Sequence, residues 1–481
     1  MAEKITAFKP SLRLFDATMI VAGSMIGSGI FIVSTDIVRN VGSAGWLIVV
    51  WAITGLMTVM AAVSYGEMSG MFPKAGGQYV YLKEAFNPLA GFLYGWSSFT
   101  VIQTATIAAV AVAFSRFTAY LIPEVGENIF LVTIGSFHIS AAQVLAIASI
   151  VFLTYTNTKG IKGGKIIQTS FTTVKLLSLF GLIVLGFLLV KHSFWAENWA
   201  TGLQAMQLEK VEGNFVNNGN WYPITGTVLI GAIAASMVGS LFSSDAWNNV
   251  TFIAGEIKNP KRNIGLSLFL GTLIVSIIYI TTNLMYLNAL PMEQIAFPGG
   301  DRVAVAASNT IFGSGGAIVI AIMIMVSTFG CNNGLILAGA RVYYTMAQDG
   351  LFFKKAAALN INSVPQWALW AQAVVASLLC LSGGYNDLLD MIAFVVVIFY
   401  VLTIIGIFVL RKKRPEAERP YKAFAYPFLP GLYIILGLIF CVFLLIFKPV
   451  YTLWGLGIVL AGIPIYYITI SGRGKNSTNI E

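Results

Sequence analysis

Residues 22–31 read AGSMIGSGIF and interrupt the first apolar segment of the chain. Each of the three glycines in this stretch weakens a helix by about 1 kcal/mol relative to alanine. The sixth apolar segment carries a second interruption, VGSLFSSDAWNN at residues 238–249. Serine, aspartate and asparagine are costly in an apolar helix, so both segments are predicted to contain a break in the helix.

The composition places these two interruptions in a membrane protein. Hydrophobic residues make up 57% of the 481 residues and charged residues only 10%, whereas soluble proteins carry about a quarter of charged residues. Segments such as 176–190 and 392–410 contain almost no polar residues, and helices that are apolar all round belong in a bilayer. The chain is therefore predicted to be an all-α protein embedded in a lipid bilayer.

Twelve apolar segments approach the length of about 20 residues that a membrane helix needs. The third and the eighth are long enough to tilt strongly or to include an interfacial turn. The expected spans are 14–38, 44–71, 88–121, 140–157, 166–191, 225–254, 264–290, 314–347, 366–384, 387–410, 427–447 and 450–471. The expected organisation is a polar segment at 1–13, a ten-helix core at 14–414, two additional helices at 415–471 and a tail at 472–481.

The distribution of positive charge predicts the orientation of these spans. With both termini in the cytoplasm, most of the 29 Lys and Arg residues lie in cytoplasmic loops, as the positive-inside rule requires. The net charge of +9 is therefore read as an orientation signal, and no nucleic-acid partner is expected. No cleaved signal peptide is expected at the polar start of the chain, and the location predicted is the plasma (inner) membrane.

The residues that usually carry catalysis or bind metals are few. His138 and His192 lie near the ends of apolar segments, and Cys331, Cys380 and Cys441 lie within them. No His, Cys and Glu cluster has the spacing of metal ligands. We therefore predict no catalytic residue, no metal site and no cofactor.

The two interruptions are related to each other in sequence and in position. Residues 23–28 read GSMIGS and residues 239–244 read GSLFSS, and the starts of the segments that contain them are offset by five spans. An odd offset inverts the second unit in the membrane, which predicts a five-plus-five inverted repeat with paired broken helices. Close helix packing through Gly23 and Gly27 is the alternative explanation of the first interruption.

A broken helix has the right chemistry for a zwitterion. It exposes N–H groups at the start of its second half and carbonyl groups at the end of its first half. The N–H groups suit a carboxylate and the carbonyls suit an ammonium group. Non-helical backbone at membrane depth survives only where it is buried or lines a cavity, so a binding site is predicted at the gap.

Several motifs of the chain resemble one family of carriers. They are GSGIF at 27–31, FPKAGGQYVYLKEAF at 72–86, GEIKNPKRNI at 255–264 and STFGCNNG at 327–334, followed by Arg341. These motifs are similar to those of the amino acid–polyamine–organocation (APC) superfamily, and the last resembles its L-type amino acid transporter branch. The resemblance runs from about residue 12 to 414. It implies a LeuT-like fold and transport of amino acids by uniport, exchange or proton symport.

The resemblance assigns the substrate site in the first span. The backbone N–H groups of Gly27, Ser28 and Gly29 would bind the substrate carboxylate, with the Ser28 hydroxyl assisting. Met25 and Ile26, on the other side of the break, would offer carbonyl groups to the amine.

The sixth span would supply the opposite wall. Phe242 matches the aromatic residue that lies over the substrate and closes the outer path, and Ser243 and Ser244 would border the pocket. Asp245 is either a partner for an amine or proton, or a cap for N–H groups freed by the break. Relatives often have glycine where this chain has Ala246.

Lys175 stands about nine residues into the fifth span, roughly 13 Å from its start, where a charge is costly and usually functional. In the L-type branch a lysine takes the place of the sodium ion that bridges the first and eighth spans in sodium-coupled relatives. We expect its ammonium group to contact the first break near residues 22–25 and the eighth span near Ser327 or Thr328. Transport is therefore predicted to be sodium-independent, with a proton as a candidate coupling ion.

Three further polar residues are candidates for the transport path. Glu67 and Glu256 lie near cytoplasmic span ends and are expected to pair with Lys or Arg and close an inner gate. Asn332 in the eighth span is a candidate polar group of the pocket.

The predicted function is secondary transport of amino acids, with neutral L-amino acids as the first candidates and a carrier of cationic amino acids or polyamines as the alternative. A channel or sensor on the same fold would show filter segments or charged rings, and a membrane enzyme would need a nucleophile and base. Neither pattern is visible in the sequence. The sequence does not indicate whether an accessory single-span subunit attaches.

Overall fold

The computed structural model describes residues 10–134, 137–211, 214–382 and 385–474, and it is built almost entirely from helices. In this part of the chain ten helices are long and apolar enough to cross a membrane, and two shorter apolar helices span Leu14–Met25 and Gln366–Leu381. The prediction of an all-α membrane protein is confirmed. The count of twelve spans stays a prediction, because these two helices are shorter than a span.

The first half of the chain contains the elements α1 Leu14–Met25, η1 Gly29–Phe31, α2 Val33–Val41, α3 Ala44–Met71, α4 Gln78–Ala85, α5 Pro88–Ser97, η2 Ser98–Ile102, α6 Gln103–Leu121, η3 Pro123–Val125, β1 Phe130–Ile134, β2 Phe137–Ser140, α7 Ala141–Thr158, α8 Ile161–Leu188 and α9 Trp195–Asn198. The second half contains β3 Met206–Leu208, β4 Lys210–Val211, β5 Asn214–Phe215, β6 Trp221–Pro223, α10 Gly226–Ser243, α11 Asn249–Phe252, η4 Ala254–Glu256, α12 Pro260–Ala289, α13 Met292–Ala296, α14 Val303–Gln348, η5 Lys354–Ala357, α15 Gln366–Ser382, α16 Tyr385–Lys413, α17 Phe428–Phe447 and α18 Pro449–Gly474.

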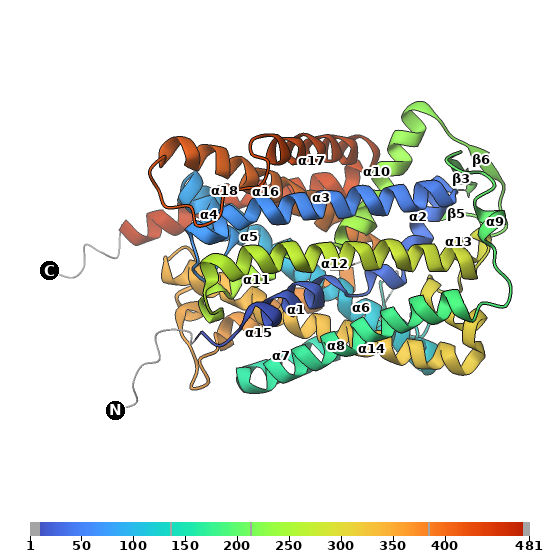
Figure 1. The fold of residues 1–481 in the computed structure, drawn as a ribbon. Coiled ribbons are helices and arrows are strands. Elements are labelled where there is room, and N and C mark those ends of the chain that lie inside the picture. Colours follow the sequence, from blue (N-terminus) through green and yellow to red (C-terminus); the bar gives the residue numbers. More distant parts are fainter. Residues whose placement is uncertain (1–9, 135–136, 212–213, 383–384, 475–481) are drawn as a thin grey trace.

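The long helices run side by side along one direction, and α1 begins at the same end of the molecule at which α18 finishes (Figure 1). Among the described residues, three antiparallel strand pairs, β1–β2, β3–β6 and β4–β5, accompany the helices. The β3–β6 pair lies at the opposite end (Figure 1). The described parts of the two terminal helices therefore support the prediction of an even number of crossings.

Both predicted breaks are present. The first span stops being helical after Met25 and resumes at Gly29, so residues 26–28 form what we call the first break. The sixth span stops at Ser243 and resumes at Asn249, so residues 244–248 form the sixth break. In both places glycine or short polar residues replace the apolar run that would continue a helix.

The packing of the helices has the pairing of an inverted repeat. In the first half α1 packs on α8, and in the second half α10 packs on α16. In the same way α6 packs on α7 and α14 packs on α15. The symmetry-related pairs α3 with α12 and α6 with α14 lie against each other at the centre. Helices five spans apart thus take equivalent places, as the repeated GSxxxS pattern predicts.

The eighth span is longer than any membrane requires. Its helix α14 extends over 46 residues, and Gly313 within it has φ 75° and ψ −173°, which kinks the chain. The residues before Gly313 therefore form a separate arm, and the predicted span 314–347 begins directly after the kink. In the third span a π-helical turn, η2, separates α5 from α6.

The segment between α8 and α10 covers the end of the bundle that carries β3–β6. Asn198 donates hydrogen bonds from Nδ2 to the carbonyls of Leu287 (2.7 Å) and Leu290 (2.8 Å) at the end of α12. Trp46 at the start of α3 donates to the carbonyl of Leu203 at 2.7 Å. This segment therefore ties α12 to the turn between α2 and α3.

Candidate functional site

The two breaks touch each other in the middle of the molecule. A Cβ atom added to Gly29 would lie 1.9 Å from Ser243 Oγ, so only glycine permits this approach of the two backbones. The hydroxyl of Tyr279 on α12 lies 3.0 Å from the carbonyl oxygen of Met25 and 2.9 Å from that of Ser243. It links the end of α1 to the end of α10, a role that nothing in the sequence around Tyr279 indicates.

Replacing Tyr279 with phenylalanine is expected to lower the free energy of unfolding by about 1 to 2 kcal/mol. The ring would still fit, but the buried Ser243 carbonyl would lose this donor and the Met25 carbonyl would keep only the Gly27 N–H, and an unsatisfied buried polar group costs about that much. Thermal unfolding in detergent would measure the change. Tyr286→Phe on the same helix is the control, because its hydroxyl makes a single, longer bond of 3.3 Å to the Ile30 carbonyl.

The first break presents free backbone donors. The Gly27 N–H is bonded to the Met25 carbonyl at 2.8 Å, but the amides of Gly29 and Ile30 have no acceptor among the described residues. Both lie in buried positions at the start of the second half of the span. These two N–H groups lie at a helix start, which attracts anions. They belong to Gly29 and Ile30, whereas the expected N–H groups were those of Gly27, Ser28 and Gly29.

The carbonyls at the end of α1 are largely in use. The Met25 carbonyl accepts from Tyr279 and from the Gly27 N–H, and the Ile26 carbonyl accepts from Lys175. Their expected role toward a substrate amine stays a prediction. In this conformation each of the two oxygens already has a partner.

Lys175 reaches the first break, as predicted. Its side chain is 1% exposed, and Nζ lies 2.5 Å from the carbonyl oxygen of Gly23 and 2.8 Å from that of Ile26. The charge therefore satisfies carbonyls that the end of α1 leaves without intrahelical partners. It comes from α8 and fixes the broken helix from the side.

The expected contact of Lys175 with Ser327 or Thr328 of the eighth span is not formed. The Thr328 hydroxyl turns back on its own helix to the carbonyls of Ile324 and Met325, and the Ser327 hydroxyl has no hydrogen-bond partner in the described residues. The eighth span instead reaches the break through Cys331, whose Sγ lies 3.3 Å from the Ser24 carbonyl. The sequence does not single out Cys331, because it lies in an apolar stretch.

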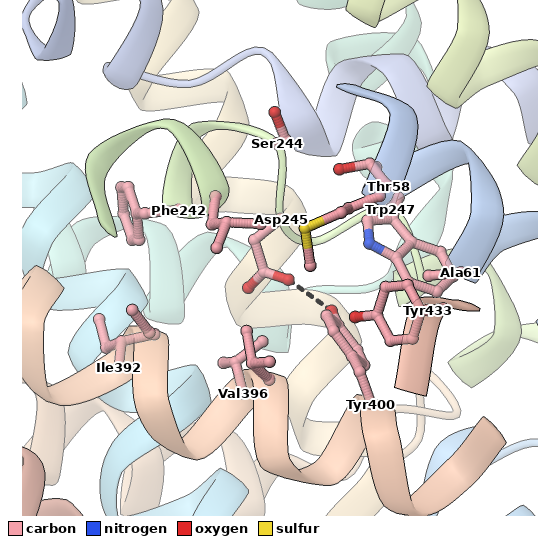
Figure 2. Close-up of a pocket in the computed structure, with 14 residues that line it drawn as sticks. Thr58, Ala61, Phe242, Ser244, Asp245, Trp247, Ile392, Val396, Tyr400 and Tyr433 are labelled. Carbon is pink, nitrogen blue, oxygen red and sulfur yellow. Dashed lines mark hydrogen bonds between the residues drawn. The ribbon is translucent and has the colours of Figure 1, made fainter. Parts of the chain in front are cut away.

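Asp245 in the sixth break is held by a tyrosine from α16. The Tyr400 hydroxyl donates to the Asp245 carboxylate (Figure 2), and the backbone N–H of Ala246 also stabilises it. Both interpretations of Asp245 stay open, since it caps a local N–H group and has no basic partner among the residues that the structure describes. Ala246 itself has φ 62°, in the left-handed region that favours glycine.

The space around Asp245 is small in this conformation. A cavity of about 20 Å³ is bordered by Phe242, Ser244 and Asp245 from the sixth span and by Tyr400 on α16; Figure 2 shows these side chains. A second cavity of about 10 Å³ lies on the other side of Asp245. Spaces of this size hold about one water molecule, so both must widen to admit a larger ligand.

The two predicted gate residues form ion pairs. Glu67 is 1% exposed and accepts a bidentate ion pair from Arg411, with N–O distances of 3.0 and 2.6 Å. It also accepts a hydrogen bond from the Ala423 N–H at 2.8 Å. Glu256 pairs with Arg341 of α14 at 2.8 Å. Both pairs lie at the end of the bundle where α1 begins, and buried pairs of this kind are costly to break.

The start of the chain closes the same end. The N–H groups of Ser11 and Leu12 donate to the Glu256 carbonyl at 2.8 and 3.0 Å, and the Lys258 N–H donates to the Leu12 carbonyl. The opposite end keeps a polar vestibule of about 80 Å³ that includes Asp36 and Lys448. The structure is thus sealed at one end and partly open at the other.

Asn332 lies buried on α14, and its Oδ1 has no hydrogen-bond partner among the described residues. Its expected contact with a ligand stays a prediction. The described residues contain no group of three or more His, Cys, Asp or Glu side chains that could hold a metal ion.

The comparison with known families identifies the architecture. The family profile described as Amino acid permease matches residues 12–470. The chain belongs to the amino acid permease family. This membership confirms the resemblance to the APC superfamily that the motifs of the first, sixth and eighth spans predict.

The permease is similar over nearly its whole length to three kinds of mammalian carrier. It is 26% identical over 475 residues to the b(0,+)-type amino acid transporter 1 of Mus musculus, a match that covers 97% of this chain and 89% of that protein. It is 29% identical to the Large neutral amino acids transporter small subunit 2 of Oryctolagus cuniculus, covering 98% and 82%. It is 27% identical to the Asc-type amino acid transporter 1 of Mus musculus, covering 98% and 84%. These relatives confirm the expected L-type branch.

Proposed function

We propose that this permease is a secondary carrier of amino acids whose substrate binds at the contact between the first and sixth breaks. The observation that carries the proposal is the pair of buried amides of Gly29 and Ile30, which have no acceptor among the described residues. Buried N–H groups are nearly always bonded, so a ligand oxygen is the natural partner. A carboxylate offers two.

The breaks suit alternating access as well as binding. Tyr279 and the Gly29–Ser243 contact join the first and sixth spans into one unit with α12. The Glu256–Arg341 ion pair joins that unit to α14, and the Glu67–Arg411 ion pair joins α3, which packs on α12, to α16 at the same end. Breaking them while the vestibule at the other end closes would expose the breaks to the opposite side.

Lys175 supports transport without sodium. Its ammonium group satisfies the carbonyls of Gly23 and Ile26, so a cation is already present beside the break. We therefore propose exchange or facilitated transport that is independent of sodium, and a proton remains a candidate coupling ion.

Neutral L-amino acids are the proposed substrates, since a relative is named for large neutral amino acids and the cavity beside Phe242 is mainly apolar, with Ile392 and Val396 on its wall. Asp245 favours the alternative of a cationic substrate, because this buried acid has no basic partner in the described part of the chain. A cationic substrate would place its side-chain charge against Asp245, whereas a neutral amino acid would not.

The proposed location is the plasma (inner) membrane with both termini in the cytoplasm, which places the Glu67 and Glu256 gates on the cytoplasmic side. One relative is named a small subunit. No partner subunit is proposed for this chain, and the candidates for binding are an amino acid, a proton and the surrounding lipid.

Counterflow in proteoliposomes tests the proposal. Vesicles loaded with unlabelled alanine, leucine, arginine or putrescine would be diluted into labelled substrate, with sodium present or replaced by choline. We expect a neutral amino acid to give the largest transient accumulation, with equal rates in the two media. Accumulation only with arginine or putrescine would support the cationic alternative. No counterflow with any of them, or a steep dependence on sodium, would contradict the proposal.

A further inference from the structure

A groove of about 520 Å³ opens on the outer side of α3 and α12, where the linker between α16 and α17 crosses them. These two helices run side by side for most of their length (Figure 1). The apolar lining includes Val63 of α3, Leu266 and Phe269 of α12, and Tyr421 and Phe424 of the linker. The groove is far larger than the cavities at the breaks and is separate from them.

The linker wall of the groove is fixed to the bundle. A Cβ atom added to Gly66 on α3 would lie 2.8 Å from the Tyr421 ring, so the ring rests on bare backbone. Two residues on, the Ala423 N–H donates to the Glu67 carboxylate at 2.8 Å. The groove is therefore a built feature of the contact between the linker and α3, and it adjoins the Glu67 ion pair.

The mouth of the groove is basic. Lys261 and Arg262 stand in the first turn of α12, at the end of the molecule that carries the gate ion pairs. Lys261 Nζ lies 3.0 Å from Glu418 Oε2, but both side chains are more than half exposed, so solvent screens this ion pair. Arg262 is exposed and makes no ion pair among the described residues. A free guanidinium therefore faces out beside a large apolar hollow.

An exposed apolar stripe continues from the groove along α12. Phe269, Leu273 and Ile277 are 37%, 36% and 54% exposed. The distance along the helix from Arg262 to Ile277 is roughly 22 Å, which exceeds the depth of one leaflet, about 15 Å. An acyl chain that starts beside Arg262 can follow this stripe to the middle of the bilayer.

We propose that this groove binds one anionic phospholipid, with its phosphate at Lys261 and Arg262 and an acyl chain between α12 and the linker. Charge selects the lipid class, because basic residues at a membrane surface attract anionic headgroups. The apolar lining and the stripe select a molecule that carries a long hydrocarbon chain. With the proposed orientation of the permease, the lipid comes from the cytoplasmic leaflet.

The bound lipid would contact α12 and the linker at once. It therefore links the unit that holds the breaks to the segment that Glu67 fixes, and its binding stabilises the closed inner end. Adding the lipid to delipidated protein should raise the temperature of unfolding.

Native mass spectrometry of the full-length permease with dioleoyl phosphatidylglycerol or dioleoyl phosphatidylcholine tests the proposal. The variants are Arg262→Gln, Lys261→Gln, the double variant and Arg262→Lys, which keeps the charge. Lys354→Gln is the matched control, since Lys354 is an exposed basic residue in η5 outside the groove. The substituted side chains are on the surface, so the variants should fold.

We expect the wild-type protein to retain one phosphatidylglycerol in preference to phosphatidylcholine. Each removed charge should weaken this retention about fivefold, while Arg262→Lys and Lys354→Gln should bind as the wild type does. Phosphatidylglycerol should raise the unfolding temperature of the wild type and not of the double variant. Equal retention of the two lipids, or undiminished phosphatidylglycerol binding by the double variant, would overturn the proposal. If a helix of another protein occupied the groove instead of a lipid, the permease would retain the two lipids equally.

Discussion

Replacing Lys175 with alanine is expected to abolish transport and to lower the free energy of unfolding by about 2 to 4 kcal/mol. The substitution leaves the carbonyls of Gly23 and Ile26 without their donor in a fully buried position. It also leaves a cavity where the lysine stem packed. The first span would then lose the conformation that presents the Gly29 and Ile30 amides, and a loss of about 2.8 kcal/mol at the site already weakens binding a hundredfold.

The test is uptake in proteoliposomes together with thermal unfolding of the same preparation. Lys191→Ala is the matched control, because Lys191 follows α8 and its side chain is exposed, so both measurements should match the wild type. Normal uptake by the Lys175→Ala protein would show that the ammonium group is not needed at the break. A variant that unfolds like the wild type yet transports nothing would assign Lys175 a role in transport that is separate from stability.

Replacing Gly29 with alanine is the second change with a large expected effect. The new Cβ would stand 1.9 Å from Ser243 Oγ, 2.5 Å from Ser243 Cβ and 3.0 Å from Ser243 Cα. Contacts this short force the two breaks apart, and overpacking of a core typically costs about 1 to 3 kcal/mol. We expect transport to fall below detection, because Gly29 also supplies one of the two free amides.

Two other glycines, Gly27 in the first break and Gly181 in α8, provide the controls for this substitution. An added Cβ at Gly27 would lie 3.3 Å from Cys331 Sγ, and at Gly181 it would meet nothing within 4 Å. In thermal unfolding, Gly29→Ala should therefore lose most, Gly27→Ala little and Gly181→Ala nothing. The double variant Gly29→Ala with Ser243→Gly should regain part of the lost stability, since it removes the atoms of the closest clash. Equal unfolding temperatures for all three single variants would mean that the breaks do not meet at Gly29.

The sequence predicts the features that depend on residue type and position along the chain. The breaks follow from glycine and short polar residues in otherwise apolar segments, and the burial of Lys175 follows from its depth in the fifth span. The ion pairs of Glu67 and Glu256 follow in the same way from the positions of these acids at span ends. Each of these residues is unusual for its surroundings, and so each stands out without a structure.

The partners that complete these features do not stand out. Tyr279 is one of 19 tyrosines in an ordinary apolar helix, yet its hydroxyl joins both breaks. Tyr400 holds Asp245 from α16, and the eighth span meets the first break through Cys331 at the Ser24 carbonyl instead of through Ser327 or Thr328 at Lys175. Such contacts depend on how helices from distant parts of the chain are rotated against each other, which local spacing does not specify.

The rotation of α14 explains the error about the eighth span. Thr328 bonds back to its own helix, a common arrangement for threonine in an apolar helix. One turn further on, Cys331 faces Ser24 and Gly27. A shift of one helical turn therefore moves the contact from a hydroxyl to a thiol. The only signal in the sequence for the role of Tyr279 is that it carries a hydroxyl group in a helix of the inverted repeat, α12.

The central claim is that a substrate carboxylate completes the first break, and a structure with a bound amino acid tests it most directly. The permease would be incubated with the amino acid that gives the strongest counterflow and studied by electron cryo-microscopy. We predict that the carboxylate oxygens lie within about 3 Å of the Gly29 and Ile30 nitrogen atoms, and that Lys175 still donates to the carbonyls of Gly23 and Ile26. A ligand bound elsewhere, with the Gly29 and Ile30 amides unoccupied or bonded to the protein itself, would contradict it.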